Sequence, residues 1–164
     1  MRPYELFIEE EACWGCRACE LACQQEHEFT SPPLLKVMEE GPHMDEKGYS
    51  FQFRVRICRH CQDPSCLPAC PQEAIYQRPD LIVLLDEARC NGCGLCLEAC
   101  PYQAIIINDS TGKPFKCDMC HLRVDHGLYP ACADNICMAH CIYFDRPQEI
   151  KAQIEAKKAR RKTR

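Results

Sequence analysis

The sequence predicts an α+β fold of two fused lobes, each made of short β-hairpins and short helices, with a helix at the C-terminus. Cysteines recur in four short runs along the chain, which indicates repeated metal-binding or cross-linked loops. Short apolar segments that end at turn residues follow these runs, as expected for β-hairpins. The last segment has Pro147 in its first turn and Ile150 and Ile154 on one face, which is typical of a helix.

Seventeen of the 164 residues are cysteine, a content that allows a disulfide scaffold, a zinc protein or an iron–sulfur protein. The first residues, MRPYELFIEEEAC, turn acidic after a few apolar residues and lack the hydrophobic region of a signal peptide. The longest apolar run, LIVLL at 81–85, is far shorter than the roughly 20 residues that cross a bilayer. We therefore expect a cytoplasmic protein without membrane insertion, whose reduced thiols hold metal.

The intervals between the cysteines separate these three classes. The first run, CWGCRACELAC, and the third, CNGCGLCLEACP, follow C-x2-C-x2-C-x3-C, the pattern of bacterial ferredoxins, and the third run includes the closing proline. The second run, CRHCQDPSCLPACP, has a middle gap of four residues. The metal ligands predicted from the three runs are Cys13, Cys16, Cys19 and Cys23; Cys58, Cys61, Cys66 and Cys70; and Cys90, Cys93, Cys96 and Cys100.

This spacing suits a [4Fe–4S] cluster better than zinc or disulfides. Three thiolates two residues apart on a tight loop can bind one face of a cubane, whereas the fourth cysteine binds the other cluster of a pair. Gly15, Gly92 and Gly94 permit the tight backbone of such loops. A zinc site does not need a third cysteine in the same short loop, and disulfides between such close cysteines are strained. The runs therefore predict paired, bacterial-ferredoxin-like iron–sulfur sites.

The fourth run holds five cysteines, one more than a cluster needs: Cys117, Cys120, Cys132, Cys137 and Cys141. An internal repeat favours Cys137 as the fourth ligand. In the second and third runs Ala and Ile begin four residues after the last cysteine, at Ala74 and Ala104, and Cys141 takes that alanine position after Cys137. Cys141 is a possible alternative ligand, because its interval from Cys137 matches that between the last two ligands of the other runs. That alternative leaves Cys132 spare.

The four runs in this order, with a long insertion after the first, resemble the four-cluster iron–sulfur subunits of molybdenum and tungsten pterin oxidoreductases. This family includes the electron-transfer subunits of dimethyl sulfoxide reductase, formate dehydrogenase and formate hydrogenlyase, and similar small subunits accompany tungsten aldehyde oxidoreductases and tungsten benzoyl-CoA reductases. The resemblance covers residues 10–145 and rests on CRHCQDPSCLPACPQEAI, CNGCGLCLEACPYQAI and KCDMCHLRVDHGLYPAC. The chain departs from the family in an extra residue before Cys137, in Met138 in place of proline, and in Cys141.

The resemblance implies how the ligands pair. The second and third runs would share two clusters, and the first and fourth runs would share the outer two. The implied ligand groups are Cys58, Cys61, Cys66 with Cys100; Cys90, Cys93, Cys96 with Cys70; Cys13, Cys16, Cys19 with Cys137; and Cys117, Cys120, Cys132 with Cys23.

We expect a polyferredoxin domain at residues 1–145 and a basic helix or tail at 146–164. The domain divides into an inner lobe, 58–107, and an outer lobe, 1–23 with 108–145; residues 24–57 form a hairpin insertion. In this insertion apolar side chains from Tyr49 to Ile57 alternate with polar ones, which predicts a half-buried strand in a hairpin that covers the ferredoxin core. Residues 151–164 hold seven Lys or Arg and one Glu, a charge that suits an acidic partner surface or a solvated tail.

The sequence predicts no enzyme. It contains no catalytic triad, phosphate-binding loop or paired-carboxylate motif, and its six histidines are expected at the surface or beside cluster loops. The leading hypothesis is an electron-transfer subunit with four [4Fe–4S] clusters, which serves a large pterin-containing catalytic subunit, preferably of the tungsten aldehyde-oxidoreductase or benzoyl-CoA reductase type, and a further redox subunit or soluble carrier. A free-standing polyferredoxin and a zinc-stabilised interaction protein are the alternatives. No groove-reading motif accompanies the basic tail, so we expect no nucleic-acid partner.

Overall fold

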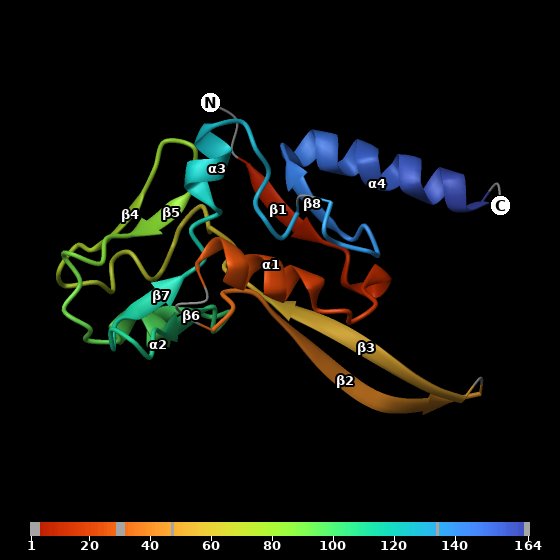
Figure 1. Ribbon diagram of the computed structural model, residues 1–164, viewed down its shortest axis with the longest axis horizontal. Helices are drawn as coiled ribbons and strands as arrows, with labels where there is room; N and C mark the ends of the chain where they lie inside the picture. Colours follow the sequence, from red (N-terminus) through yellow and green to blue (C-terminus); the bar gives the residue numbers. More distant parts are fainter. Residues whose placement is uncertain (1–3, 29–31, 47, 134, 163–164) are drawn as a thin grey trace.

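The computed structural model describes residues 4–28, 32–46, 48–133 and 135–162; residues 1–3 of the predicted domain and 163–164 of the predicted tail lie outside this part. The described chain mixes short strands and short helices, as an α+β protein does (Figure 1). Its elements in order are β1 (Glu5–Ile8), the 3-10 helix η1 (Glu10–Ala12), α1 (Ala18–Glu26), β2 (Lys36–Asp45), β3 (Gly48–Arg56), β4 (Ile75–Gln77), β5 (Val83–Leu85), α2 (Leu95–Ala99), β6 (Ile105–Ile107), β7 (Pro114–Lys116), α3 (His121–Asp125), β8 (Ile142–Asp145) and α4 (Pro147–Lys162).

The strands form two-stranded antiparallel sheets, and the pair β1–β8 joins the two ends of the domain. Its register runs from Glu5 opposite Asp145 to Ile8 opposite Ile142. Just beyond the pair, the N–H of Glu9 donates to the carbonyl of Cys141 at 2.8 Å. Because β1 precedes the first cysteine run and β8 follows the fourth, this pairing brings the two runs together.

The hairpins β4–β5 and β6–β7 follow the second and third cysteine runs, where the sequence places them. Their first strands begin at Ile75 and Ile105, the isoleucines of the internal repeat. These two side chains pack with Val83 and Cys96 in one apolar cluster, and a larger second cluster contains residues of β1, β8 and α1. The apolar residues of the short strands therefore pack around the cysteine loops.

The hairpin β2–β3 forms as predicted, but it does not cover the core as the sequence led us to expect. It extends away from the rest of the protein (Figure 1). Only its base is buried, at Val37 and Val55, whereas Tyr49 is 74% exposed near the tip. The alternating pattern correctly predicts a strand. Alternation shows which side chains share a face of the strand, but it does not show what packs against that face. At the base, the Glu10 carboxylate accepts the N–H of Val55 at 2.8 Å and ties the hairpin to η1.

Helix α4 packs along β8 with Ile150 buried and Ile154 half-buried, so both isoleucines face the same side, as predicted. The Lys157 ammonium fixes the far part of the helix, because it donates to the carbonyl of His140 at 2.6 Å and to the Glu9 carboxylate at 3.1 Å. The helix thus lies against the loop of the fourth cysteine run. In the described part of the chain, no helix combines the length and apolar composition that a bilayer crossing requires.

Candidate metal centres

All seventeen cysteines lie in the described part of the chain as free thiols. Sixteen of them form four groups, in which thiols of one short loop meet a thiol from another run. We call these groups thiol sets one to four. Set one contains Cys13, Cys16, Cys19 and Cys137; set two contains Cys58, Cys61, Cys66 and Cys100; set three contains Cys90, Cys96 and Cys70, to which we assign the exposed Cys93 of the same loop; set four contains Cys117, Cys120, Cys132 and Cys23.

Set one and Cys141 together line a small apolar cavity, whose wall includes Val37 and Val55 from the base of the hairpin β2–β3. In its loop the N–H of Gly15 donates to Cys13 Sγ at 3.4 Å. Burial, followed by the neighbouring thiols of Cys137 and Cys13, raises the pKa of Cys19 to about 12. The four thiols are thus close together, with Cys19 and Cys137 buried and Cys16 exposed.

Set two lines a second cavity, with Lys116 and Val83 in the wall. Burial is the main cause that raises the pKa of Cys61 and of Cys66, and Cys58 and Cys100 raise both further. Because Cys100 belongs to the third run, this cavity joins the second and third runs.

Set three joins the same two runs in the opposite sense. It combines the loop of the third run with Cys70 of the second run. Burial, followed by the Cys90 thiol, raises the pKa of Cys96 to about 11, and Cys70 contributes in the same direction. The N–H of Gly92 donates to Cys90 Sγ at 3.4 Å, as Gly15 does in set one.

Set four combines the fourth loop with Cys23, which lies on α1. Burial raises the pKa of Cys120 to about 12, and Cys23 adds to the shift. Burial also raises the pKa of Cys132 well above its ordinary value, with further contributions from Cys120 and Cys23. The N–H of Met119 donates to Cys117 Sγ at 3.4 Å, so this loop aims its backbone at sulfur as the first and third loops do.

The four loops share one backbone feature that the sequence reveals only in part. The residue before the second cysteine of each C-x2-C pair has a positive φ, a conformation that glycine adopts without strain. Glycine occupies it in two loops, and the sequence gives no signal for it in the others. The four residues and their φ values are Gly15 at 67°, His60 at 43°, Gly92 at 78° and Met119 at 60°.

Residues 137–142 have the same backbone arrangement as residues 70–75 and 100–105. The residue three places after the cysteine has a φ of 48° in each, and its N–H donates to the carbonyl of that cysteine; these residues are Glu73, Gln103 and His140. The next N–H points at the cysteine sulfur, at 3.3 Å from Ala74 to Cys70 Sγ and at 3.4 Å from Cys141 to Cys137 Sγ. Cys141 thus stands at the position of the alanines. Its own Sγ also lies close, 3.5 Å from Cys137 Sγ.

Thiols of different sets raise one another's pKa, which indicates which sets lie near each other. After burial and its own set, Cys132 of set four is raised in pKa by Cys19 of set one. After burial, Cys58 of set two is the largest cause of the raised pKa of Cys117 in set four. Cys66 of set two acts likewise on Cys96 of set three, after burial and Cys90. Set four is thus near sets one and two, and set three is near set two.

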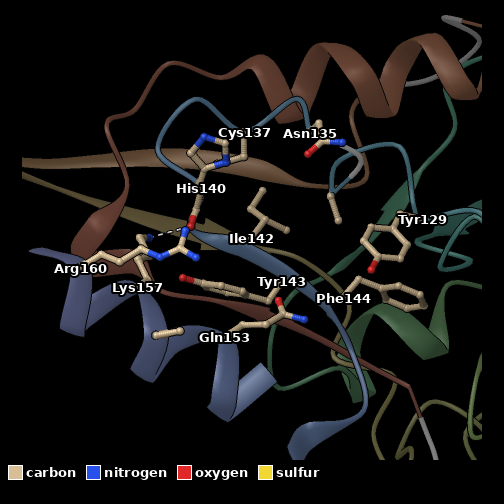
Figure 2. Close-up of a pocket in the computed structure, with 12 residues that line it drawn as sticks. Tyr129, Asn135, Cys137, His140, Ile142, Tyr143, Phe144, Gln153, Lys157 and Arg160 are labelled. Atoms are coloured by element: carbon tan, nitrogen blue, oxygen red, sulfur yellow. Dashed lines mark hydrogen bonds between the residues drawn. The ribbon is translucent and has the colours of Figure 1, made fainter. Parts of the chain in front are cut away.

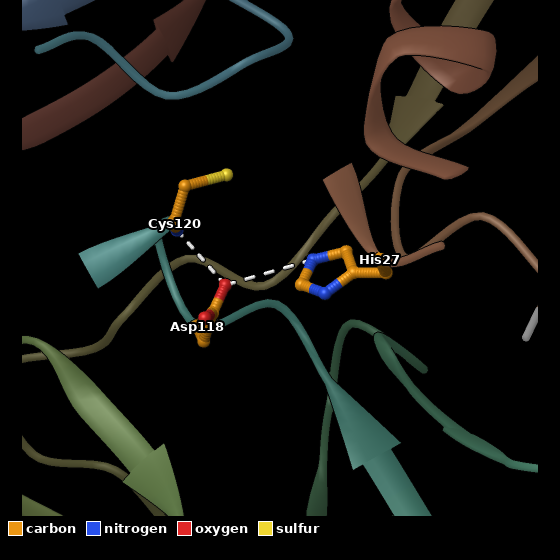
Figure 3. Close-up of side chains that lie close together, drawn as sticks. All are labelled: His27, Asp118 and Cys120. Atoms are coloured by element: carbon orange, nitrogen blue, oxygen red, sulfur yellow. Dashed lines mark hydrogen bonds and ion pairs between the residues drawn. The ribbon is translucent and has the colours of Figure 1, made fainter. Parts of the chain in front are cut away.

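The carboxylate of Asp118 organises the loop of set four (Figure 3). It accepts the N–H of Cys120 at 2.8 Å, lies 3.7 Å from His27 Nε2, and faces His121 Nδ1 at 3.1 Å. His27, Asp118 and Cys120 are close enough together to resemble a small metal site. Since Cys120 already belongs to set four, these side chains surround that set and do not form a separate centre.

A larger cavity of about 890 Å³ lies between α4 and β8, beside Cys137 (Figure 2). Its wall includes Tyr143, His140 and Lys157. No carboxylate belongs to the described residues that line it.

The donor chemistry of the four sets matches an iron–sulfur cubane, because each offers four cysteine sulfurs and the loops point backbone N–H groups at them. Comparison with known families agrees. Residues 49–146, more than half of the chain, match the family described as the 4Fe-4S dicluster domain. The chain belongs to this family. As a 4Fe-4S dicluster protein it carries [4Fe–4S] clusters, as the cysteine spacing predicts.

Relatives of this 4Fe-4S dicluster protein include components of several reductases. A chain of the anaerobic dimethyl sulfoxide reductase of Escherichia coli is 35% identical over 156 residues, covering 90% of this protein and 76% of the relative. A chain of the polysulfide reductase of Wolinella succinogenes is 33% identical, covering 93% of this protein and 81% of the relative. A subunit of the tetrathionate reductase of Salmonella typhimurium is 36% identical, and this protein spans 54% of its length. The resemblance to the iron–sulfur subunit of dimethyl sulfoxide reductase is confirmed.

Proposed function

We propose that this chain is an electron-transfer subunit that holds four [4Fe–4S] clusters in a row, one in each thiol set. The observation that carries the proposal is that cysteines of different runs meet in one cavity, Cys137 with the first loop in set one and Cys100 with the second loop in set two. Bound clusters supply one-electron oxidation and reduction. The two-lobe division at 58–107 and at 1–23 with 108–145 is part of this proposal, with sets two and three in the inner lobe.

The protein's own residues hold and tune these sites. The sixteen thiols of the four sets are the ligands, and Cys141 is spare, as the shared backbone of residues 70–75, 100–105 and 137–142 supports. Apolar side chains, such as Val55 in set one and Val83 in set two, line part of these sites. Backbone N–H groups aimed at sulfur, such as that of Gly15, stabilise negative charge there.

The partner that we propose is a large pterin-containing catalytic subunit, with a second redox subunit or a soluble carrier at the other end of the row. Such a partner is supported by the relatives, which are named as single components of dimethyl sulfoxide, polysulfide and tetrathionate reductases. In its more specific form, the proposal includes the partner and location expected from the sequence. The partner is then a tungsten enzyme of the aldehyde-oxidoreductase or benzoyl-CoA reductase type, and the complex is cytoplasmic. We propose that the larger partner, and not this chain, carries out the catalysis, since the relatives are named as single chains of larger reductases.

Anaerobic purification with the native partners, followed by metal, sulfide and pterin analysis, tests this function. The proposal predicts co-purification with a larger pterin-containing subunit and about 16 iron and 16 sulfide per copy of this chain. A chain that purifies alone under these conditions indicates a free-standing polyferredoxin. Zinc without acid-labile sulfide contradicts electron transfer altogether.

A further inference from the structure

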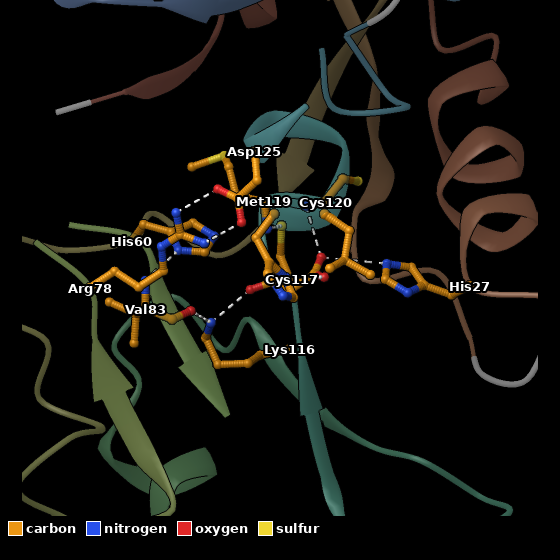
Figure 4. A network of polar contacts seen from close by, with 12 residues as sticks. His27, His60, Arg78, Val83, Lys116, Cys117, Met119, Cys120 and Asp125 are labelled. Carbon is orange, nitrogen blue, oxygen red and sulfur yellow. Dashed lines mark hydrogen bonds and ion pairs between the residues drawn. The ribbon is translucent and has the colours of Figure 1, made fainter. Parts of the chain in front are cut away.

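Lys116 is a buried cation at the junction between set two and set four. It ends β7, immediately before Cys117, and its side chain is only 3% exposed. Its ammonium donates to the carbonyl of Cys117 at 2.6 Å and to the carbonyl of Val83 on β5 (Figure 4). Both acceptors are neutral, and a buried ammonium needs an opposite charge to offset its lost hydration.

No carboxylate among the described residues forms an ion pair with Lys116. Asp80 and Asp125 pair with another cation, because the Arg78 guanidinium lies 2.6 Å from Asp125 and 2.9 Å from Asp80. Figure 4 shows this arginine and Asp125 directed at each other, apart from the lysine contacts. The carboxylate of Asp118, two residues along the chain from Lys116, accepts the N–H of Cys120 and faces His27 and His121. The counter-charge must therefore come from another kind of group.

His60 does not supply that counter-charge. Its Nδ1 accepts the N–H of Val83 at 3.0 Å, so the proton of the neutral ring is on Nε2. Burial, followed by the charge of Lys116, holds the pKa of His60 well below its ordinary value. The ring stays neutral, and its Nε2 has no hydrogen-bond partner in the described structure.

Cysteine sulfurs, which become negative thiolates when they bind a cluster, are the groups that share a cavity with Lys116. Lys116 lines the cavity of set two, together with all four of its cysteines. The same ammonium is held beside set four, because it donates to the carbonyl of Cys117, the residue that follows it in the chain. One fixed positive charge therefore lies next to ligands of both sets.

We propose that Lys116 is a positioning residue that raises the reduction potentials of the clusters held by sets two and four, at the step where an electron crosses between them. The inference rests on the proposed function. A cluster bound by four thiolates becomes more negative when it gains an electron, and a nearby buried cation stabilises this reduced form. The position of Lys116, with its backbone in the loop of set four and its ammonium at set two, makes one residue act on both.

Redox titration of the anaerobically purified chain, followed by electron paramagnetic resonance, tests the proposal. Lys116→Met removes the charge and keeps a long apolar stem, and Lys116→Gln also keeps a hydrogen-bond donor. We expect both variants to retain their iron and sulfide. At least one cluster should be about tenfold harder to reduce, a shift of about 59 mV to lower potential for a one-electron couple. Lys116→Arg keeps the charge and should stay close to the parent.

Lys113→Met is the matched control, because Lys113 lies on the same hairpin and donates instead to the carbonyl of Glu87 at the surface. Its potentials should equal those of the parent. Unchanged potentials in both neutral Lys116 variants, with all clusters present, overturn the inference and leave the four-cluster proposal intact. If the neutral variants lose iron, the arginine variant decides: retention of all clusters supports a role of the charge, and loss shows that Lys116 acts by packing.

Discussion

The backbone N–H of Cys141 lies 3.4 Å from Cys137 Sγ, in the position where the N–H of Ala74 meets Cys70 Sγ at 3.3 Å. Cys137 is therefore expected to bind iron, and Cys141 to be spare. Cys141→Ala should keep about 16 iron per chain, whereas Cys137→Ala should lose about four. Iron and sulfide analysis after anaerobic purification measures both. Loss of a cluster in Cys141→Ala but not in Cys132→Ala would show that the repeat register is wrong.

Gly15 is expected to be essential for set one, because a Cβ there would lie 2.3 Å from the Phe53 ring at a φ of +67°. Gly15→Ala should cost about 1–3 kcal/mol in backbone strain, with a steric clash in addition. Gly94→Ala is the control, because Gly94 has a φ of +78° with nothing within 4 Å of an added Cβ. The rate of iron release on mild heating should rise much more for Gly15→Ala than for Gly94→Ala. Equal rates would contradict the clash.

Glu10 should stabilise the base of the projecting hairpin. Glu10→Ala removes the acceptor of the buried Val55 N–H, and an unsatisfied buried donor costs about 1–3 kcal/mol. The Val55 amide should exchange hydrogen faster by the corresponding factor. Glu40→Ala is the control, because it removes the other carboxylate beside Arg54. The Glu40 side chain is 46% exposed, so its loss should change the exchange rate of the Val55 amide little. A similar response to both substitutions would show that the Arg54 ion pairs, and not the Val55 bond, hold the hairpin.

Lys157 should hold α4 against the loop that contains Cys137. Its ammonium donates to the carbonyls of Ala139 and His140 and to Glu9, whereas the neighbouring Lys158 is exposed. Lys157→Ala should speed amide exchange in α4 and oxidative loss of the cluster in set one, because that set lies under the same loop. Lys158→Ala should leave both rates unchanged. Unaltered exchange in Lys157→Ala would mean that Ile150 alone fixes the helix.

Local spacing determines most of what the sequence predicts correctly. The C-x2-C intervals predict the loops, and the repeat predicts strands that begin at Ile75, Ile105 and Ile142. These features depend on neighbours in the chain, so a single sequence carries them. The direction of the hairpin β2–β3 depends on what packs against its faces, and for that reason the predicted cover was wrong beyond Phe53, where Phe51 and Tyr49 are exposed.

Other features of the site depend on contacts between distant residues. The buried charge of Lys116 arises because β7 lies beside β5 and the cavity of set two, and the sequence shows only a lysine before a cysteine. His60 and Met119 adopt backbone conformations typical of glycine because the loops around them require it. Two of the four C-x2-C loops have glycine before the second cysteine. Equivalence of position in the C-x2-C interval was therefore the one signal in the sequence for the positive φ of His60 and Met119.

Counting electrons in a reductive titration tests the proposed row of four clusters most directly. The isolated chain, purified without oxygen and titrated to full reduction, should accept about four electrons, and its fully reduced spectrum should show magnetic interaction between neighbouring clusters. Uptake of about two electrons with half the iron, or zinc in place of iron and sulfide, would contradict it.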